Sequence, residues 1–397
     1  MAFTFEILGG AGGAGSAAGE EVPWRLGRHA RLGRLTTPHG VVETPAFMPV
    51  GTLGSVKGVT PQELASAGAA ILLANLYHLA LRPGVDTLER LGGLHSFTGW
   101  PGPLITDSGG FQVWSLGALR RIDDGGVTFR SHLDGSPRRF TPEEVVRWQE
   151  RLGVDIAMVL DECTPWPVSR EAAAASWERT LAWARRSRAA WSGATGGGLF
   201  GIVQGSVYPD LRQRAAAELA ACDFAGYAIG GVSVGEPAAR RREVVEETAP
   251  ALPPERPRYL MGVGYPADIL HAAAQGVDLF DCVLPARNAR HGVLFTRAGV
   301  VKIRHAAYRD DPRPLDPACG CPCCQRLSRA FLHHLMRAGE LTGPVLATLH
   351  NLRYYLDFMG ELRQAIALGA LADLAARLVP SPAGPAEDLG APQASSD

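Results

Sequence analysis

The sequence has no excess of charge of either sign and no long apolar run. Its 397 residues include 39 lysines and arginines and 40 aspartates and glutamates, a formal net charge of −1. A chain so close to neutral is not drawn as a whole to nucleic acid or to a membrane, so any polyanion site has to come from local clustering. The longest apolar stretch, Ala69–Leu81, is interrupted by polar residues. Since a membrane-spanning helix needs about 20 apolar residues, we expect no membrane segment.

Two further patterns are missing, a secretory signal and the spaced cysteines of a disulfide framework. No basic residues precede an apolar core at the N-terminus, and four of the seven cysteines fall between positions 319 and 324. Thiols clustered in this way indicate metal binding in a reducing compartment. We therefore expect a cytoplasmic protein with a thiolate-rich metal site.

The remaining composition is that of a globular chain, with 46% hydrophobic and 20% charged residues. The Gly/Ala-rich segment 1–24 is predicted to be flexible after a short β-like run, and the Pro/Ala/Ser-rich tail 380–397 to be disordered. Residues 25–375 are predicted to form one catalytic domain that includes a metal-binding subdomain at about 300–360.

Within that domain, short apolar runs alternate with helical patterns, which predicts an α/β fold with a parallel sheet. The strand-like runs are Ala70–Leu73, Leu104–Thr106, Ile156–Leu160, Leu199–Val203, Tyr227–Ile229, Arg258–Met261 and Val277–Phe280. The helical patterns are Pro142–Leu152, Arg170–Ala190, Leu211–Ala221, Ala238–Thr248 and Pro266–Ala274.

Almost every one of these runs is followed by a residue suited to chemistry. In chain order they are Asn75, Asp107, Asp161, Gln204, Gly230 with Gly231, Gly262 with Gly264, and Asp281. In a (β/α)8 barrel the carboxyl ends of all strands meet at one mouth, whereas an open doubly wound sheet binds only near its switch point. So many polar strand ends, spread over some 200 residues, favour the closed TIM barrel.

A metal site is predicted from the cysteine cluster and a downstream histidine. Cys319, Cys321 and Cys324 with His350 give C-x-C-x2-C-x25-H, a saturated Cys3His set of the kind that holds structural zinc. Spacing alone also allows Cys323 in place of Cys324. It likewise allows one of His333 and His334 in place of His350, which lies in the helical pattern Val345–Leu356.

The strand ends could together read a purine base. Asp107 is followed by Ser108, by Gly109 and Gly110, beside which a planar ligand could lie, and by the ring of Phe111. A carboxylate at Asp161, the carboxamide of Gln204 and backbone N–H groups near Gly231 can pair with base edges.

A local basic segment follows Asp281. The segment 286–313 contains seven arginines and lysines but only two aspartates, whereas the chain as a whole has nearly equal numbers of basic and acidic residues. Basic residues beside a strand-end site predict a phosphate-binding rim.

These motifs resemble those of the bacterial tRNA-guanine transglycosylases, the enzymes of queuosine modification, over roughly residues 25–375. The matching segments are Arg34–Val50, Asp107–Gln112, Asp161–Pro167, Gly201–Gly205, Ala228–Glu236, Gly262–Asp268, Phe280–Gly292 and the Cys/His set. The resemblance implies a (β/α)8 barrel with an inserted and C-terminal zinc subdomain, in a homodimer.

The resemblance also implies a role for each matching residue. Asp281 would be the nucleophile and Asp107 the general acid/base. The base would be bound by Asp107, Ser108, Gly109, Gly110, Phe111, Asp161, Cys163, Gln204, Gly231 and Met261. The tRNA would contact Gly262, Val263, Gly264, Tyr265, Pro266, Ala267, Asp268, Ala286, Arg287, Asn288, Ala289 and Arg290. Zinc would be held by Cys319, Cys321, Cys324 and His350, which leaves Cys323 as a spare thiol.

The implied reaction exchanges the wobble guanine of tRNAs for Asp, Asn, His and Tyr for 7-aminomethyl-7-deazaguanine. It would proceed by double displacement through a covalent Asp281–ribose intermediate. Leu76, Val232 and Ala286 depart from the usual pattern, and Ala286 lies in a segment implied to contact the tRNA. Two rival hypotheses are a zinc-dependent hydrolase on the same barrel and a non-catalytic RNA-binding subunit.

Overall fold

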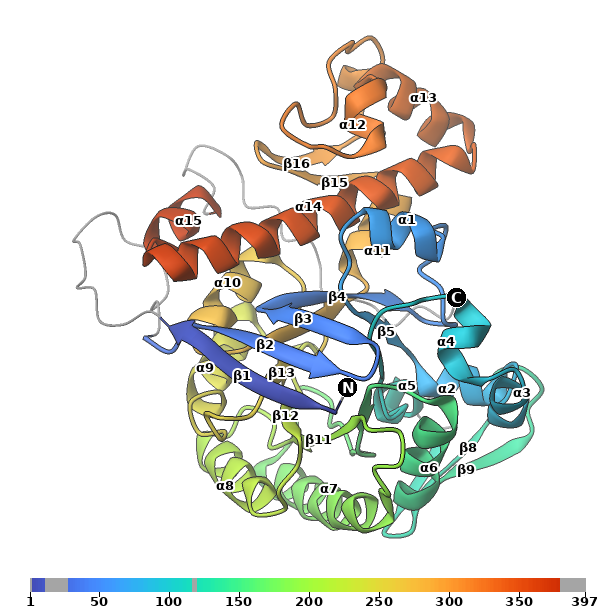
Figure 1. Ribbon diagram of the computed structural model, residues 1–397, viewed down its shortest axis with the longest axis vertical. Helices are drawn as coiled ribbons and strands as arrows, with labels where there is room; N and C mark the ends of the chain where they lie inside the picture. Colours follow the sequence, from blue (N-terminus) through green and yellow to red (C-terminus); the bar gives the residue numbers. More distant parts are fainter. Residues whose placement is uncertain (1, 11–27, 116–119, 379–397) are drawn as a thin grey trace.

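The computed structural model describes residues 2–10, 28–115 and 120–378, and these form a closed parallel barrel with three additions (Figure 1). The barrel order is β4-β5-β6-β10-β11-β12-β13-β14, closing on β4. The strands are β4 (Ala46–Gly51), β5 (Leu72–Ala74), β6 (Leu104–Thr106), β10 (Ile156–Met158), β11 (Gly198–Val203), β12 (Gly226–Ile229), β13 (Arg258–Leu260) and β14 (Leu279–Cys282). The predicted TIM barrel is confirmed. Strand β4 was missed, because Pro45 and Pro49 interrupt its apolar pattern.

Helices cover the outside of the barrel. They are α1 (Pro61–Ser66), α2 (Leu76–Leu81), α3 (Val85–Arg90), α4 (Gly93–Thr98), α5 (Gly110–Ser115), α6 (Pro142–Leu152), α7 (Arg170–Ala190), α8 (Pro209–Ala220), α9 (Ala238–Thr248) and α10 (Pro266–Ala274). Local signals set their ends: in α6 the Thr141 hydroxyl accepts from the N–H of Glu144, and Gly153 ends the helix in the left-handed conformation. The predicted bounds of α6, α7, α9 and α10 are confirmed.

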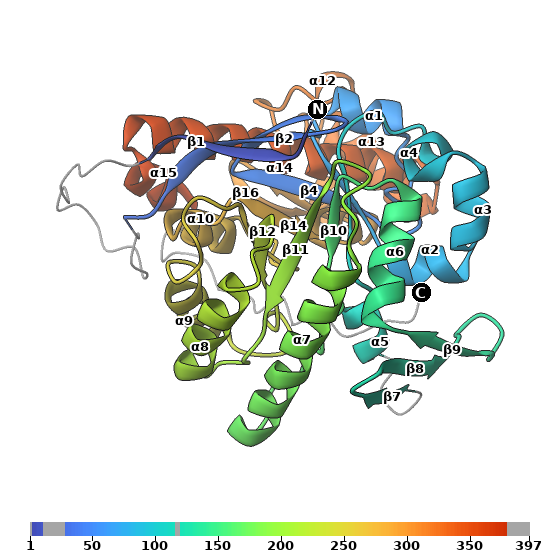
Figure 2. The ribbon, with the colours of Figure 1, turned by 60° about the horizontal axis from the view of Figure 1, so that its bottom comes forward.

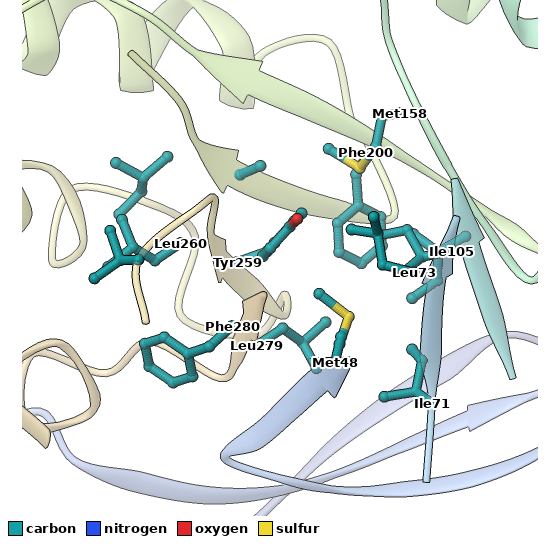
Figure 3. Packing of buried hydrophobic residues seen from close by; sticks show 14 of the residues in the cluster. Met48, Ile71, Leu73, Ile105, Met158, Phe200, Tyr259, Leu260, Leu279 and Phe280 are labelled. Atoms are coloured by element: carbon teal, nitrogen blue, oxygen red, sulfur yellow. The ribbon is translucent and has the colours of Figure 1, made fainter. Parts of the chain in front are cut away.

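Large apolar side chains fill the barrel interior (Figure 3). Met48, Ile105, Met158 and Phe200 are all fully or almost fully buried. A Cβ at Gly226 would lie 2.4–2.6 Å from the Phe200 ring, so only glycine leaves room for that ring on the neighbouring strand. Because the interior is packed, a ligand site has to lie at an end of the barrel rather than inside it.

The amino-terminal ends of the strands are covered by an antiparallel sheet of β1 (Thr4–Gly10), β2 (Arg31–Thr37) and β3 (Gly40–Thr44). Arg31 on β2 forms a buried ion pair with Asp278, which directly precedes β14, at 2.6 Å. Strand β1 lies in the segment 1–24 that the sequence analysis expected to be flexible; it is paired with β2. Residues 11–24 of that segment and the tail 380–397 lie outside the described residues.

Of the other two additions, the first lies away from this cover, whereas helix α14 (Thr342–Leu368) of the second contacts β1 and β2 (Figure 2). An antiparallel sheet of β7 (Arg120–Asp123), β8 (Gly126–Arg130) and β9 (Pro137–Phe140) follows β6 and α5. After β14 come α11 (Leu284–Arg290), β15 (Val293–Thr296), β16 (Gly299–Lys302), α12 (Pro322–Arg326), α13 (Arg329–Ala338), α14 (Thr342–Leu368) and α15 (Leu371–Leu378). Side chains from α11, β15, β16, α12, α13 and α14 form a second, smaller hydrophobic core. Among the described helices, none is long and apolar enough to span a membrane.

Candidate active site and metal centre

Asp107 follows β6 and is held by three donors. Its Oδ2 accepts from the side-chain amides of Asn75 (2.5 Å) and Gln112 (2.9 Å), and its Oδ1 accepts from the N–H of Leu76 at 2.9 Å. Burial raises the pKa of Asp107 to about 6 in spite of these bonds, and the charge of Asp281 contributes in the same direction. Leu76 departs from the family pattern, but it donates to Asp107 through its backbone N–H, so its side chain does not affect this hydrogen bond.

Asp161 follows β10 and lies beside the glycine turn after Asp107. Its two oxygens accept from the Ser108 hydroxyl at 3.1 Å and from the Gln204 amide at 2.7 Å. A Cβ on Gly110 would lie 2.6 Å from Asp161 Oδ1, so this close approach requires glycine. Burial raises the pKa of Asp161 to about 6. The predicted neighbours Ser108, Gly110, Asp161 and Gln204 therefore form one connected group.

Gln204 joins this group to the backbone after β12. A Cβ on Gly231 would lie 2.3 Å from Gln204 Oε1, and Gly231 itself has a φ of +65°. Gln204 Oε1 is buried and has no hydrogen-bond partner in the described protein. A buried acceptor without a partner is unfavourable, so this atom is suited to pairing with a donor on a ligand.

Asp281 lies within β14, one residue before the strand ends. Its Oδ1 accepts two hydrogen bonds of 2.7 Å, from the Tyr259 hydroxyl and from the N–H of Gly262. No donor to Oδ2 occurs among the hydrogen bonds of the described residues, which leaves that oxygen available. Burial raises the pKa of Asp281, while hydrogen bonding to the N–H of Gly262, to Tyr259 and to its own backbone N–H acts in the opposite direction.

Asp107 and Asp281 share the same mouth of the barrel. Asp281 raises the pKa of Asp107 through space, and burial together with the charges of both carboxylates raises the pKa of Tyr259. Tyr259 points into the middle of the barrel (Figure 3). One carboxylate with an available oxygen and a second with a pKa near neutrality could serve as nucleophile and as proton carrier on one substrate.

The predicted flanks of the pocket differ in exposure. Phe111 is 49% exposed, and Met261 is partly buried against the main core. Cys163 is buried, and burial together with the charge of Asp161 raises the pKa of its thiol. A neutral thiol next to Asp161 is suited to shaping the pocket rather than to attacking a substrate.

The two segments predicted to contact tRNA are only partly accessible. Side chains of Val263, Ala286 and Ala289 are buried, and Asp268 is engaged in ion pairs with Arg241 and Arg242. Partly buried or exposed positions are Gly262, Tyr265, Pro266, Ala267, Arg287, Asn288 and Arg290. In the basic segment Arg297 and Arg313 are paired with acidic residues. Arg287 and Arg290 of α11 are the two basic side chains within the predicted tRNA-contacting segments, and both are partly buried.

The metal centre lies in the second core. Ligand atoms of Cys319, Cys321, Cys324 and His350 lie within 4.8 Å of one another, all on buried residues. His350 Nε2 lies 2.7 Å from the carbonyl of Phe295 and donates its proton there, so Nδ1 keeps its lone pair beside the thiols. These four residues could hold a metal ion. Cys323 is outside the group, and His333 bonds to the carbonyl of Ile303 instead.

Helix α14 connects the metal centre to the mouth. It carries His350, and one turn later Tyr355 donates a 2.6 Å hydrogen bond to the carbonyl of Gly264. Gly264 belongs to the same loop as Gly262, whose N–H holds Asp281. The described residues contain one other group suited to a metal, His39, His95 and Asp155, and neither group includes a carboxylate of the mouth. The arrangement therefore gives no support to a metal-dependent hydrolase.

Several partners of the site were not predicted from the sequence. Tyr259 looks like an apolar strand residue, and Gln112 was quoted only as part of a motif. Tyr77, which bonds to His132 of the β7–β9 insertion at 2.9 Å, packs against Gly109. A polar atom within an otherwise apolar strand was the one available signal for Tyr259.

A closed (β/α)8 barrel with carboxylates gathered at the carboxyl ends of its strands defines a barrel enzyme, because this mouth is where such enzymes carry out catalysis. The sequence matches the queuine tRNA-ribosyltransferase family over residues 27–381. It is 56% identical to a queuine tRNA-ribosyltransferase of Desulforudis audaxviator over 85% of this chain and 91% of that protein. It is 56% identical to one of Aromatoleum aromaticum over 88% and 94%. The chain belongs to the queuine tRNA-ribosyltransferase family.

Proposed function

We propose that this protein is a tRNA-guanine transglycosylase that replaces the wobble guanine of tRNA by 7-aminomethyl-7-deazaguanine. The observation that carries the proposal is the pairing of two carboxylates at one mouth. Asp281 keeps one oxygen available, and the pKa of Asp107 is raised to about 6. Family membership and the names of the relatives support the choice of a tRNA substrate.

The first displacement forms a bond between Asp281 Oδ2 and C1′ of the wobble ribose. The glycosidic bond breaks, its electron pair goes to N9 of guanine, and Asp107 supplies the proton that neutralises the leaving base. Tyr259 and the N–H of Gly262 hold the other oxygen of Asp281, so the attacking oxygen keeps a fixed direction. The product of this step is a covalent tRNA–enzyme ester.

The second displacement reverses these steps with a different base. The incoming 7-deazaguanine loses its N9 proton to Asp107, attacks C1′ and releases Asp281. One glycosidic bond replaces another, so the exchange needs no ATP, and two inversions retain the configuration. A carboxyl group with a pKa of about 6 can both give and take a proton near neutral pH.

Base selection is assigned to the group around Asp161. The Asp161 carboxylate would accept from the N1–H and 2-amino group of guanine. The second hydrogen of Gln204 Nε2, whose first donates to Asp161, and the backbone N–H of Gly231 would donate to the 6-oxo group. Phe111 and Met261 would flank the ring. The wobble base has to leave its stack to enter the mouth, at a cost of a few kcal/mol that is smallest in a loop.

The proposed tRNA substrates are those with a wobble guanine, for Asp, Asn, His and Tyr, with Arg287 and Arg290 beside the phosphates. Incorporation of labelled guanine into tRNA transcripts with guanine or adenine at the wobble position tests this proposal. We expect incorporation only into the transcript with the wobble guanine, and equal incorporation into both would contradict the proposal.

We propose that the Cys3His centre binds one structural zinc ion per chain, because four protein ligands leave no open coordination position. Zinc there would join α12 to α14. The Cys321→Ala variant should lose the metal and fold poorly, whereas Cys323→Ala should keep one equivalent, as measured by elemental analysis. Retention of zinc by Cys321→Ala would contradict the ligand set.

We further propose a homodimer. Leu341 is 83% exposed and Phe331 is 45% exposed, and both belong to the α13–α14 region. The family resemblance supports the dimer, and these two exposed side chains are candidate contacts for the partner chain. Sedimentation of the protein should give twice the chain mass, and Leu341→Glu should shift it toward the monomer.

A further inference from the structure

Arg212 is a buried arginine directly behind the base-binding group. It lies on α8 and is 0% exposed. Every hydrogen bond that the structure gives it goes to a backbone carbonyl: Ser206 at 2.7 Å, Gly230 at 2.8 Å, Gly231 at 3.2 Å and Val203 at 3.3 Å. None of the ion pairs among the described residues involves it. A fully buried cation is costly, so its retention calls for a specific purpose.

The position of Arg212 fixes the direction of two consecutive peptide groups. The carbonyls of Gly230 and Gly231 both point to its guanidinium. In a trans peptide the N–H lies opposite the carbonyl, so the N–H groups of Gly231 and Val232 point away from Arg212. Neither N–H group has a partner among the hydrogen bonds of the described residues. The φ of +65° at Gly231 allows both carbonyls to face the same cation.

Gln204, one of the groups that would read the base, lies against the same two glycines. Gln204 Nε2 and Oε1 lie 3.0 and 2.3 Å from Cβ positions built on Gly230 and Gly231. Gln204 in turn donates to Asp161. The two backbone donors are thus next to the amide–carboxylate pair, where an oxygen acceptor on a purine would meet them.

We propose that Arg212 is a positioning residue that selects 6-oxopurines by holding the Gly231 N–H toward the 6-oxo group of the base. This inference rests on the proposed function and names a determinant of its specificity. Arginine suits the role because its planar fork of five N–H donors can hold several carbonyls in fixed directions. Methionine has no donor and would release both carbonyls.

Arg258 provides a matched control at the other end of the barrel. It is 4% exposed, also donates to a backbone carbonyl, that of Leu252 at 2.7 Å, and begins β13 at its amino-terminal end. Replacing either arginine by methionine removes one buried guanidinium of the same size. Both variants should lower the unfolding temperature, so stability alone does not distinguish a structural role from a positioning role.

The test is the binding of free guanine and of 6-thioguanine to the purified full-length protein. The two bases differ only at position 6, where sulfur is a poorer hydrogen-bond acceptor than oxygen. In the wild type we expect a preference for guanine, and in Arg212→Met that preference should fall about tenfold, the worth of one hydrogen bond. Arg258→Met should keep the wild-type ratio, and Arg212→Lys should recover part of it.

An unchanged ratio in Arg212→Met would overturn the inference, even if the variant were destabilised. If Arg212→Met does not fold, Arg212→Lys decides the question, since a compact ammonium cannot hold both carbonyls and its ratio should still fall. A wild-type protein that binds neither base would instead overturn the proposed function. The two failures are therefore distinguishable.

Discussion

An aspartate lies at each end of strand β10, and the pKa values of the two are shifted in opposite directions. Asp155 directly precedes the strand and Asp161 follows it, and both are buried. Burial alone would raise the pKa of Asp155, but hydrogen bonds from His95, the N–H of Leu104 and His39 bring it below the usual value. Asp161, with two neutral side-chain donors, has its pKa raised to about 6.

On strand β14 burial raises the pKa of both carboxylates, and the contrast lies in their partners. Asp278 at its start is bound by the Arg31 guanidinium and by the N–H of Arg258, whereas Asp281 near its end has two neutral donors and one available oxygen. The covered end of the barrel thus surrounds its carboxylates with charged or numerous donors. At the open end the carboxylates have only neutral donors, which lowers the stability of the fold and leaves them able to react with a substrate.

The largest effect is expected from Asp281→Asn. Removal of the nucleophile should lower the rate of guanine exchange by at least about 10⁴-fold, as with other nucleophiles that form covalent intermediates. Its unfolding temperature should not fall, because the lost carboxylate has no cationic partner. Exchange of labelled guanine and a thermal melt on the same sample measure both quantities; wild-type turnover would contradict the assignment.

The reverse pattern is expected from Asp278→Asn on the same strand. Breaking this buried pair leaves Arg31 without its counter-ion, which should lower the free energy of unfolding by about 3–5 kcal/mol. The folded fraction should retain its turnover. A urea titration and the rate of guanine exchange together test the role of the Asp278–Arg31 pair. Loss of turnover without loss of stability would contradict the proposed difference between the covered and the open end of the barrel.

A pH-dependent effect is expected from Asp161→Asn. The pKa of Asp161 is higher in the folded protein than in the unfolded chain, so its contribution favours folding at low pH and is lost as the pH rises from about 4 past 6. Relative to the wild type, the variant should gain on the order of 2–3 kcal/mol between pH 4 and pH 8. Asp107 titrates in both proteins and cancels in this difference. If the difference in free energy of unfolding between the variant and the wild type stayed constant across that range, the pKa of Asp161 would not be raised by folding.

The smallest effect is expected at the covered end from His39→Ala. The side chain is partly exposed, and the N–H of residue 39 still donates to Asp155 at 3.1 Å after the substitution. Loss of one side-chain hydrogen bond should lower the free energy of unfolding by about 1 kcal/mol, measured as a small shift in the denaturant midpoint, and the rate of guanine exchange should not change. A lower rate of guanine exchange would mean that the covering sheet affects the active site.

The sequence predicted the barrel because strand–helix alternation and polar strand ends are local patterns. Four helices have their predicted bounds, and the strand-end residues Asp107, Asp161, Gln204 and Asp281 do gather at one mouth. The covering sheet and the β7–β9 insertion were not predicted, since short antiparallel strands without a repeated pattern give weak signals.

The partners of the buried carboxylates could not be predicted from the sequence, because they lie far away in the chain. Asp278 and Asp281 are three residues apart, yet one pairs with Arg31, 247 positions distant, and the other with Tyr259. Nothing local distinguishes the two carboxylates. Spacing also allowed two cysteine choices for the metal centre; the family resemblance implied Cys324 rather than Cys323, and the fold groups Cys324 with the other ligands.

The most direct test of the account is to find where the ribose becomes attached. Acid-quenched enzyme and tRNA, separated under denaturing conditions and analysed by mass spectrometry, should contain a tRNA adduct that lacks one guanine. Peptide mapping should place this adduct on Asp281, and Asp281→Asn should form none. An adduct on Asp107 or Asp161, or one that persists in Asp281→Asn, would contradict the division of roles proposed for the mouth.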